Sequence, residues 1–299
     1  MLGEMLGLVL AQFGAAQQVL YGIILGIVQG VAEWLPISSK TQVLVVSTYL
    51  LNLNFQQAYT FGLFMEIGSV IAAVIYFRKE LVSLVQVLLG SPDAKKRKLF
   101  VYVLTATVVT GVIGTPLYLF ADSITGLAVG IPMLIIGAVL ILDSVLIWHS
   151  RRRRDAGRMG ARKLDDLKMK DFVIVGAMQG IAALPGVSRS GITTSTLLLM
   201  DVEPDEAFRL SFLVGIFAAV AAFSLTLIVS HSNVSASLAA IGLTGVVAAI
   251  VTSSIVSICL IDFLIKVAGK SKIVYVTAAL GIIAIAGGVI YLALGLGVA

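Results

Sequence analysis

The chain has 299 residues, of which 59% are hydrophobic and 12% are charged, and its mean hydropathy is +1.05. Soluble domains carry about 25% charged residues, so this composition excludes a soluble globular protein and predicts an integral membrane protein with several spans. The net charge of +5 comes from basic residues in loops between apolar segments, so it does not indicate a nucleic-acid partner.

The first apolar stretch covers residues 20–51 and is broken at Pro36. It contains the run GIVQGVAEWLPISSKT, which places a carboxylate, several hydroxyl groups and a lysine in apolar surroundings. Because proline ends a helix, we expect two helical arms with an irregular tip between them. Glu33 follows Gln29 by four residues, so both side chains share one helix face and point toward the tip.

Apolar segments of spanning length follow this first stretch. A span of the hydrocarbon core needs about 20 apolar residues. We expect membrane helices at about 58–77, 99–120, 126–147, 206–229, 238–263 and 273–297, with an external turn at 231–233. Glu66 lies in the middle of the first of these helices and is a second candidate carboxylate, a structural role being the alternative.

Residues 171–200 form a second broken apolar stretch, which contains the run GAMQGIAALPGVSRSG. This run aligns with the first one when a single residue is deleted, so that Arg189 corresponds to Lys40. An uncompensated arginine at membrane depth costs roughly 3 kcal/mol, which disfavours a purely incidental Arg189. The duplicated, proline-broken and charged motif therefore predicts a membrane site for an anion.

Basic residues gather in three loops that fix the predicted topology. Of the 21 Lys and Arg residues, six lie between Arg78 and Lys98, nine between Arg151 and Lys170, and three between Lys266 and Lys272. We assign these loops to the cytoplasmic side, as solvated loops that orient insertion, with a binding patch as the alternative. Residues 171–200 then start and end on one side, which predicts a re-entrant hairpin rather than one continuous span.

The sequence thus predicts an all-α integral membrane protein with an inverted-topology repeat, two re-entrant helical hairpins and about six transmembrane helices. We expect a single membrane domain over 1–299, with repeat halves at about 17–147 and 171–299 joined by a cytoplasmic loop at 148–170. Such a repeat places its site near the midplane, where irregular backbone lines a cavity or is buried by protein.

The polar groups at the two breaks suit a phosphate or diphosphate. Arg189 offers a planar fork for phosphate oxygens, and hydroxyl groups add neutral donors from both halves. The candidate binding residues are Gln29, Ser38, Lys40, Gln42, Gly186, Ser188, Ser190 and Thr193. The alternative for each hydroxyl group is that it only satisfies backbone groups freed by the break.

Glu33 has two natural roles beside an anion site. It can hold a divalent cation, for which hard oxygen ligands favour Mg²⁺ or Ca²⁺ over zinc, or it can act as a general base. A structural alternative is an internal ion pair with Lys40 or Arg189. Neither histidine belongs to the site, because His149 lies at a helix end and His231 in the predicted external turn.

The run QGVAEWLPISS at 29–39 resembles the glutamate/glutamine-rich motif of the undecaprenyl-diphosphate phosphatase (bacitracin-resistance protein) family, and PGVSRSGIT at 185–193 resembles that family's second motif. The resemblance extends over residues 20–297. It implies a multi-pass plasma-membrane hydrolase that removes the terminal phosphate from a polyprenyl diphosphate, with a divalent cation, Mg²⁺ or Ca²⁺. The product would be the monophosphate carrier lipid, recycled for cell-wall glycan synthesis.

By position, the resemblance implies three catalytic residues: Glu33 as the motif carboxylate, Ser39 as nucleophile or phosphate ligand, and Arg189 as the diphosphate clamp. Gln29 lies where family members carry Glu or Gln. Gln42 departs from the pattern, because it replaces a histidine and cannot shuttle a proton near neutral pH. Glu33 then carries proton transfer alone, or catalysis is slower, or the chain binds lipid phosphates without cleaving them.

The alternative function is a lipid-phosphate flippase or transporter without hydrolysis, because inverted repeats are also the architecture of transporters. A flippase would expose its site alternately to both sides and would release no phosphate. A scaffold with a relict site gives no reason to bury Arg189 and Glu33 at matched positions. The expected partners are the polyprenyl diphosphate lipid and the membrane, without nucleic acid, and a homodimer is left open.

Overall fold

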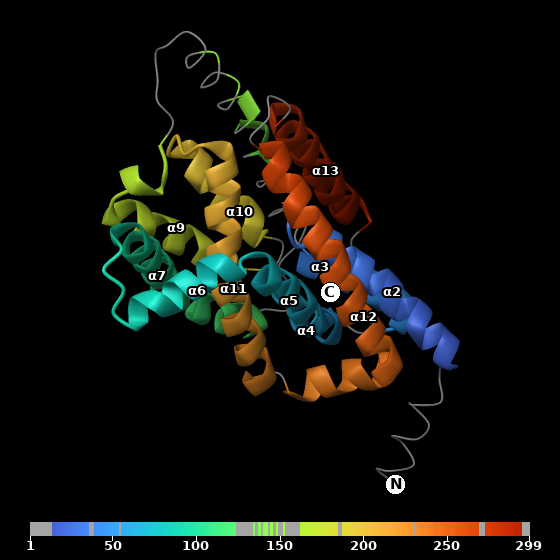
Figure 1. Cartoon of the computed structure of the whole chain (residues 1–299). Helices are drawn as coiled ribbons and strands as arrows, with labels where there is room; N and C mark the ends of the chain where they lie inside the picture. The colour runs from blue at the N-terminus through green and yellow to red at the C-terminus, as the bar shows by residue number, and fades with distance from the viewer. Residues whose placement is uncertain are drawn as a thin grey trace.

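The computed structural model has an all-α architecture (Figure 1). It describes residues 14–35, 39–53, 55–123, 162–184, 187–229, 231–268 and 273–294, with scattered residues between 134 and 152. The elements are α2 (Ala15–Ala32), α3 (Ser39–Leu51), α4 (Phe55–Phe64), α5 (Glu66–Tyr76), α6 (Arg78–Leu88), α7 (Ala94–Ser123), the 3-10 turn η1 (Leu164–Asp166), α9 (Met169–Ile181), α10 (Arg189–Leu199), α11 (Pro204–Val229), α12 (His231–Ala268) and α13 (Ile273–Ala293). These described parts contain no strand.

Among the described helices, α2, α7, α11 and α12 are each long and apolar enough to cross a membrane. A fifth span is formed at most by residues 61–88, where α5 and α6 meet at an angle of 76°. Large apolar side chains such as Val112, Ile228 and Leu243 are exposed on the outer faces of these helices. The chain is therefore a multi-pass membrane protein.

The span expected at 58–77 is occupied by α4 and α5, which are separated only by Met65. α2, expected as an arm of a hairpin, also has the length to cross the membrane by itself. One predicted boundary was wrong. The turn expected at 231–233 is the start of α12. The helix bends instead at Gly242, whose φ of 76° favours glycine, and Figure 1 shows the first part of α12 turned steeply away from the rest. The span expected at 126–147 lies largely outside the described residues.

Each proline break separates two helices, as the sequence predicts: α2 from α3, and α9 from α10. The tips of the two resulting hairpins contact each other. Lys40 Nζ donates to the carbonyl oxygen of Ala182 at 2.9 Å, while the hydroxyl groups of Ser188 and Ser190 donate to that of Leu35 at 3.3 and 3.2 Å. Side chains of each hairpin thus donate hydrogen bonds to a backbone carbonyl group just after the first helix of the other hairpin.

Arg162 joins the two ends of the second hairpin. Its guanidinium donates to the Asp171 carboxylate at 2.5 Å, in the first turn of α9, and to the Met200 carbonyl oxygen at 3.1 Å, at the end of α10. Its backbone also pairs with Asp201 and Glu203. The hairpin therefore begins and ends at one level. The orientation of the two repeat halves in the membrane stays a prediction.

The most extensive contact between described helices is that of α2 with α12, which lie alongside each other in Figure 1. Gly22, Gly26 and Gly30 recur every four residues along α2 and face α12. A Cβ atom at Gly26 would lie 2.6 Å from the carbonyl oxygen of Ala249, so only glycine allows this approach. Small residues at this spacing are a common means of helix association in membranes.

We expect Gly26→Ala to separate α2 from α12 and to lower the melting temperature in detergent by several degrees, because the clash is with backbone. Gly14→Ala is the matched control, since no atom of the described residues lies within 4 Å of a Cβ there. Thermal unfolding followed by intrinsic fluorescence measures both variants. Equal melting temperatures for the two would contradict the packing described for α2.

Candidate active site

The centre of the molecule holds an arginine between two carboxylates. Glu33 follows α2, Glu66 begins α5, and Arg189 begins α10. The Arg189 guanidinium pairs with Glu33 through Nη2 and lies 3.4 Å from Glu66 Oε2 through Nη1, which also donates to the Gly215 carbonyl oxygen at 2.8 Å. The ion pair that the sequence offered as an alternative for Glu33 is thus present, and it joins residues 156 positions apart.

Ser39 lies directly against the Glu33 carboxylate. Its hydroxyl group donates to Glu33 Oε2 at 2.7 Å, and Gln29 Nε2 donates to the same oxygen at 2.8 Å. The Gln29 amide also reaches the Ser69 hydroxyl group at 3.3 Å, which is itself within hydrogen-bond distance of Ser253 and Ser257. Glu33 is 5% exposed and Gln29 is fully buried, so this network is fixed by packing.

The charges at the centre balance. Glu33 and Glu66 are two acidic groups, Lys40 and Arg189 are two basic ones, and all four are largely buried. Pairing is required, because an isolated buried charge is costly. The set has no excess positive charge with which to hold a polyanion.

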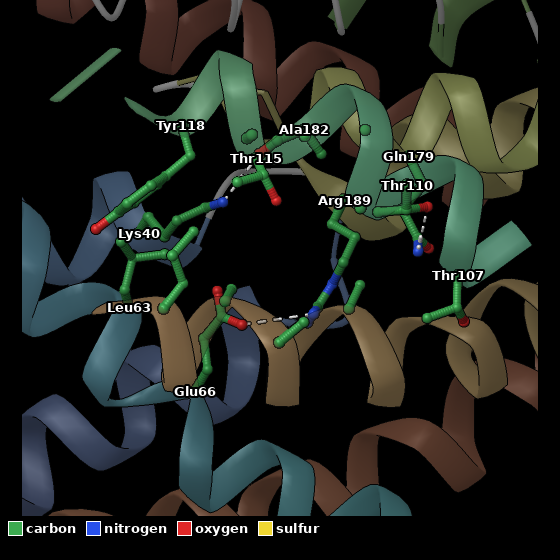
Figure 2. Close-up of a pocket in the computed structure, with 18 of the residues that line it drawn as sticks. Lys40, Leu63, Glu66, Thr107, Thr110, Thr115, Tyr118, Gln179, Ala182 and Arg189 are labelled. Carbon is green, nitrogen blue, oxygen red and sulfur yellow. Dashed lines mark hydrogen bonds and ion pairs between the residues drawn. The ribbon is translucent and has the colours of Figure 1, made fainter. Parts of the chain in front are cut away.

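A cavity of about 340 Å³ adjoins these charges. Figure 2 shows Lys40, Glu66 and Arg189 on its wall, with Leu63 and Tyr118 at one side. Much of the α11 wall is apolar, and the lining there consists of Ala218, Ala221, Ala222, Leu225 and Ile228. Ile228 is 79% exposed, so the cavity reaches the outer face of a membrane helix. A cavity with a few charges and an apolar wall suits an amphiphile with an anionic head.

The other predicted binding residues are distributed around the two tips. Ser188 caps α10 and, with Ser190, holds the opposite tip, whereas the Thr193 hydroxyl group donates to the Arg189 carbonyl oxygen and pairs with Ser211. These three hydroxyl groups serve contacts within the protein. Gln42 lies half-buried in the first turn of α3, and Ser38 and Gly186 lie outside the described residues.

Three cavity residues, Thr107, Thr110 and Gln179, were absent from the prediction, and Glu66 was only a secondary candidate. Gln179 could have been found, because it occupies the position of Gln29 in the repeat. The threonines come from α7, which carries no part of the duplicated motif. Their place in the cavity follows from the packing of α7 against α9, where a Cβ at Gly176 would lie 2.5 Å from the Ala106 carbonyl oxygen.

Three side chains at the centre carry oxygen atoms that could hold a divalent cation: Gln29, Glu33 and Glu66. Gln29 Oε1 is buried without a hydrogen-bond partner among the described residues, and its amide nitrogen is bound to Glu33. Glu33 and Glu66 add carboxylate oxygens, which hard cations prefer. No cluster of three His, Cys, Asp or Glu side chains that could hold a metal occurs in the described chain. Two carboxylates are fewer than a metal site made of protein ligands alone uses, so a cation here would also need ligands from the substrate.

Comparison with known proteins gives concordant matches over nearly the whole chain. The family model described as bacitracin resistance protein BacA matches residues 22–286. A protein named undecaprenyl-diphosphatase from Saccharolobus solfataricus is 46% identical over 273 residues, covering 91% of this chain and 96% of the relative. Proteins of the same name from Sulfurisphaera tokodaii and Pyrobaculum aerophilum are 44% and 39% identical, covering 88% and 89% of this chain and 94% and 96% of their own lengths.

We expect Arg189→Met to lower the free energy of unfolding by about 3 kcal/mol or more, because two buried carboxylates lose their shared cation. Glu33→Gln in the Arg189→Met background should recover part of this loss, since it removes one unpaired charge. Thermal unfolding of the single and double variants in detergent measures the effect. A double variant that is less stable than Arg189→Met alone would argue against charge pairing as the cause.

Proposed function

The chain belongs to the bacitracin resistance protein BacA family, and we propose that it is an undecaprenyl-diphosphatase that cleaves the terminal phosphate from the lipid diphosphate. The products are the lipid monophosphate and orthophosphate, so the activity returns a carrier lipid for cell-wall glycan synthesis. The observation that supports this most directly is the buried contact of Ser39 with Glu33, which in turn pairs with Arg189. A hydroxyl group, a carboxylate and a guanidinium are the parts that hydrolysis of a phosphoric anhydride needs.

The two tips provide a seat for the diphosphate. Ser39 and Arg189 are the first residues of α3 and α10, so each helix directs the positive end of its dipole toward its tip. The Arg189 guanidinium supplies donors that match phosphate oxygens. Lys40 Nζ, now on the Ala182 carbonyl oxygen, lines the same cavity. The apolar wall of α11 then receives the prenyl chain from the membrane.

Glu33 is placed to accept the proton that hydrolysis releases. In one route Ser39 Oγ attacks the terminal phosphorus, Glu33 takes the hydroxyl proton, and the lipid monophosphate leaves; water then cleaves the phosphoserine. In the other route Glu33 takes a proton from water, which attacks the phosphorus directly, and Ser39 binds a phosphate oxygen. Both routes assign proton transfer to Glu33, which fits Gln42 in place of a histidine.

We propose a divalent cation, Mg²⁺ or Ca²⁺, as cofactor, held by Glu33, Glu66 and the Gln29 amide oxygen. When bound, it would neutralise charge on the diphosphate oxygens. The balance of the four buried charges supports this, because a diphosphate adds negative charge that Lys40 and Arg189 alone do not offset. Association of two copies of the chain stays a prediction. The flippase alternative has no support from the relatives, which are named for hydrolysis.

We expect purified protein in detergent to release orthophosphate from undecaprenyl diphosphate with Mg²⁺, and to lose the activity with a chelator. Glu33→Gln and Ser39→Ala should each lower kcat about 100-fold or more, because they remove the base and its partner. Ser83→Ala is the matched control, since the exposed Ser83 hydroxyl group donates to the Lys79 carbonyl oxygen within α6. Full activity in Glu33→Gln would refute its role. A phosphoserine at Ser39 in acid-quenched single turnovers would select the first route.

We expect Glu66→Gln to raise the Mg²⁺ concentration for half-maximal activity at least tenfold, because a carboxylate ligand becomes a neutral amide. The activity at saturating Mg²⁺ should fall less. A titration of phosphate release against Mg²⁺ measures both quantities. Glu80→Gln is the control, since Glu80 pairs with Arg209 away from the cavity. An unchanged Mg²⁺ dependence in Glu66→Gln would exclude Glu66 as a ligand.

A further inference from the structure

One wall of the cavity carries a second polar cluster, made of neutral side chains from α7 and α9: Thr107, Thr110 and Gln179. In the view of Figure 2 this cluster and Lys40 lie on either side of Arg189. Gln179 is 2% exposed, and its Nε2 donates to Thr110 Oγ1 at 3.1 Å. Thr110 in turn donates to the Gly176 carbonyl oxygen at 3.0 Å, which fixes the orientation of the amide.

Two atoms of this cluster are left unsatisfied. Gln179 Oε1 and Thr107 Oγ1 are buried and have no hydrogen-bond partner in the part of the chain that the structure describes. Buried polar atoms in proteins nearly always have a partner. The pair consists of one acceptor, the amide oxygen, and one hydroxyl group that can donate. A bound group that satisfies both must offer a donor and an acceptor together.

The repeat explains why this half of the cavity is neutral. Gln179 corresponds to Gln29. Four residues after Gln29 the first half has Glu33, whereas four residues after Gln179 the second half has Ala183. The second half therefore keeps the amide and lacks the carboxylate. No carboxylate follows Gln179 in the way that Glu33 follows Gln29, so an anion beside Gln179 is not repelled by such a group. The charged side chain of this tip that lines the cavity is Arg189.

We propose that Thr107, Thr110 and Gln179 form a second phosphate subsite that binds a protonated phosphate group after cleavage. This proposal rests on the proposed hydrolysis, which generates such groups. A P–OH donates to Gln179 Oε1, while Thr107 donates to a P–O⁻ oxygen. Orthophosphate carries at least one P–OH at neutral pH, and a phosphate monoester, with its second pKa near 6, carries one part of the time. The linking phosphate of an intact diphosphate carries none, and its terminal phosphate carries one only part of the time, so the subsite favours orthophosphate.

The occupant is either free orthophosphate or the phosphate end of the lipid product, and both are products of the same step. Either product would then lie on the wall formed by α7 and α9, on the other side of Arg189 from Lys40 (Figure 2). The part of the cavity beside Lys40 would be clear for the next diphosphate. It would also make the enzyme sensitive to inhibition by its own product.

The test is binding of orthophosphate, of undecaprenyl monophosphate and of sulfate to purified protein in detergent, measured by thermal stabilisation. Sulfate has the charge and shape of phosphate but no proton to donate at neutral pH. We expect phosphate to stabilise the wild-type protein more than sulfate does. Thr107→Val and Gln179→Met should weaken phosphate binding about tenfold and remove its advantage over sulfate.

Thr105→Val is the matched control, because this threonine also lies on α7 but contacts Met169 Sδ rather than the cavity. Its phosphate affinity should equal that of the wild-type protein. Selective weakening of orthophosphate binding identifies free phosphate as the occupant, and selective weakening of lipid monophosphate binding identifies the phosphate end of the lipid product. Thr107→Val preserves the shape of the side chain, so it decides the test if Gln179→Met does not fold.

Unchanged phosphate affinity in Thr107→Val would overturn the subsite, as would equal affinity of the wild-type protein for phosphate and sulfate. Neither result touches the proposed hydrolysis, which is measured separately by phosphate release. Conversely, phosphate binding that depends on Thr107 and Gln179, in a protein that cleaves no diphosphate, would preserve the subsite and refute the phosphatase. The two proposals therefore fail by different measurements.

Discussion

A guanidinium buried in a membrane protein must be paired, and Arg189 finds its partners on the opposite half of the chain. Glu33 and Glu66 lie before and after the first hairpin's second arm, whereas Arg189 starts an arm of the second hairpin. The three groups can meet only if both tips reach the same depth. The ion pair therefore constrains the position of each hairpin, and the cavity beside Arg189 follows from that position.

The contacts between the tips follow the same constraint. A helix broken inside a membrane leaves carbonyl groups without partners, and water is scarce there. Lys40 satisfies a carbonyl of the second hairpin, while Ser188 and Ser190 satisfy one of the first. Trp34 packs edge-on against Phe212 of α11, with ring centroids 4.9 Å apart, and fixes the first tip laterally. The residues that permit irregular backbone are thus those that frame the candidate active site.

Much of this arrangement could be predicted from the sequence, because it depends on local signals. The prolines marked both breaks, and the ion pair of Glu33 with Arg189 was foreseen only as the structural alternative to a functional role for Glu33. Glu66 was harder to place, since it lies within an apolar helix and no motif surrounds it. The start of α12 was missed because Ser and Asn favour helix starts as well as turns, and Gly242 takes the bend instead. The position of α7 depends on packing against α9, which leaves no periodic mark in the sequence.

The duplication supplies two similar half-sites, and the chemistry requires them to differ. A carboxylate at each tip, together with Glu66, would exceed the positive charge available and repel a diphosphate. Two neutral tips would provide no proton acceptor. In this chain the Gln29 amide donates to Glu33, which lies four residues later, whereas Ala183 lies four residues after Gln179. Arg189 lies between the halves and pairs with the acidic one. The repeated motif thus forms both tips, and a carboxylate in only one of them distinguishes the reactive half from the neutral one.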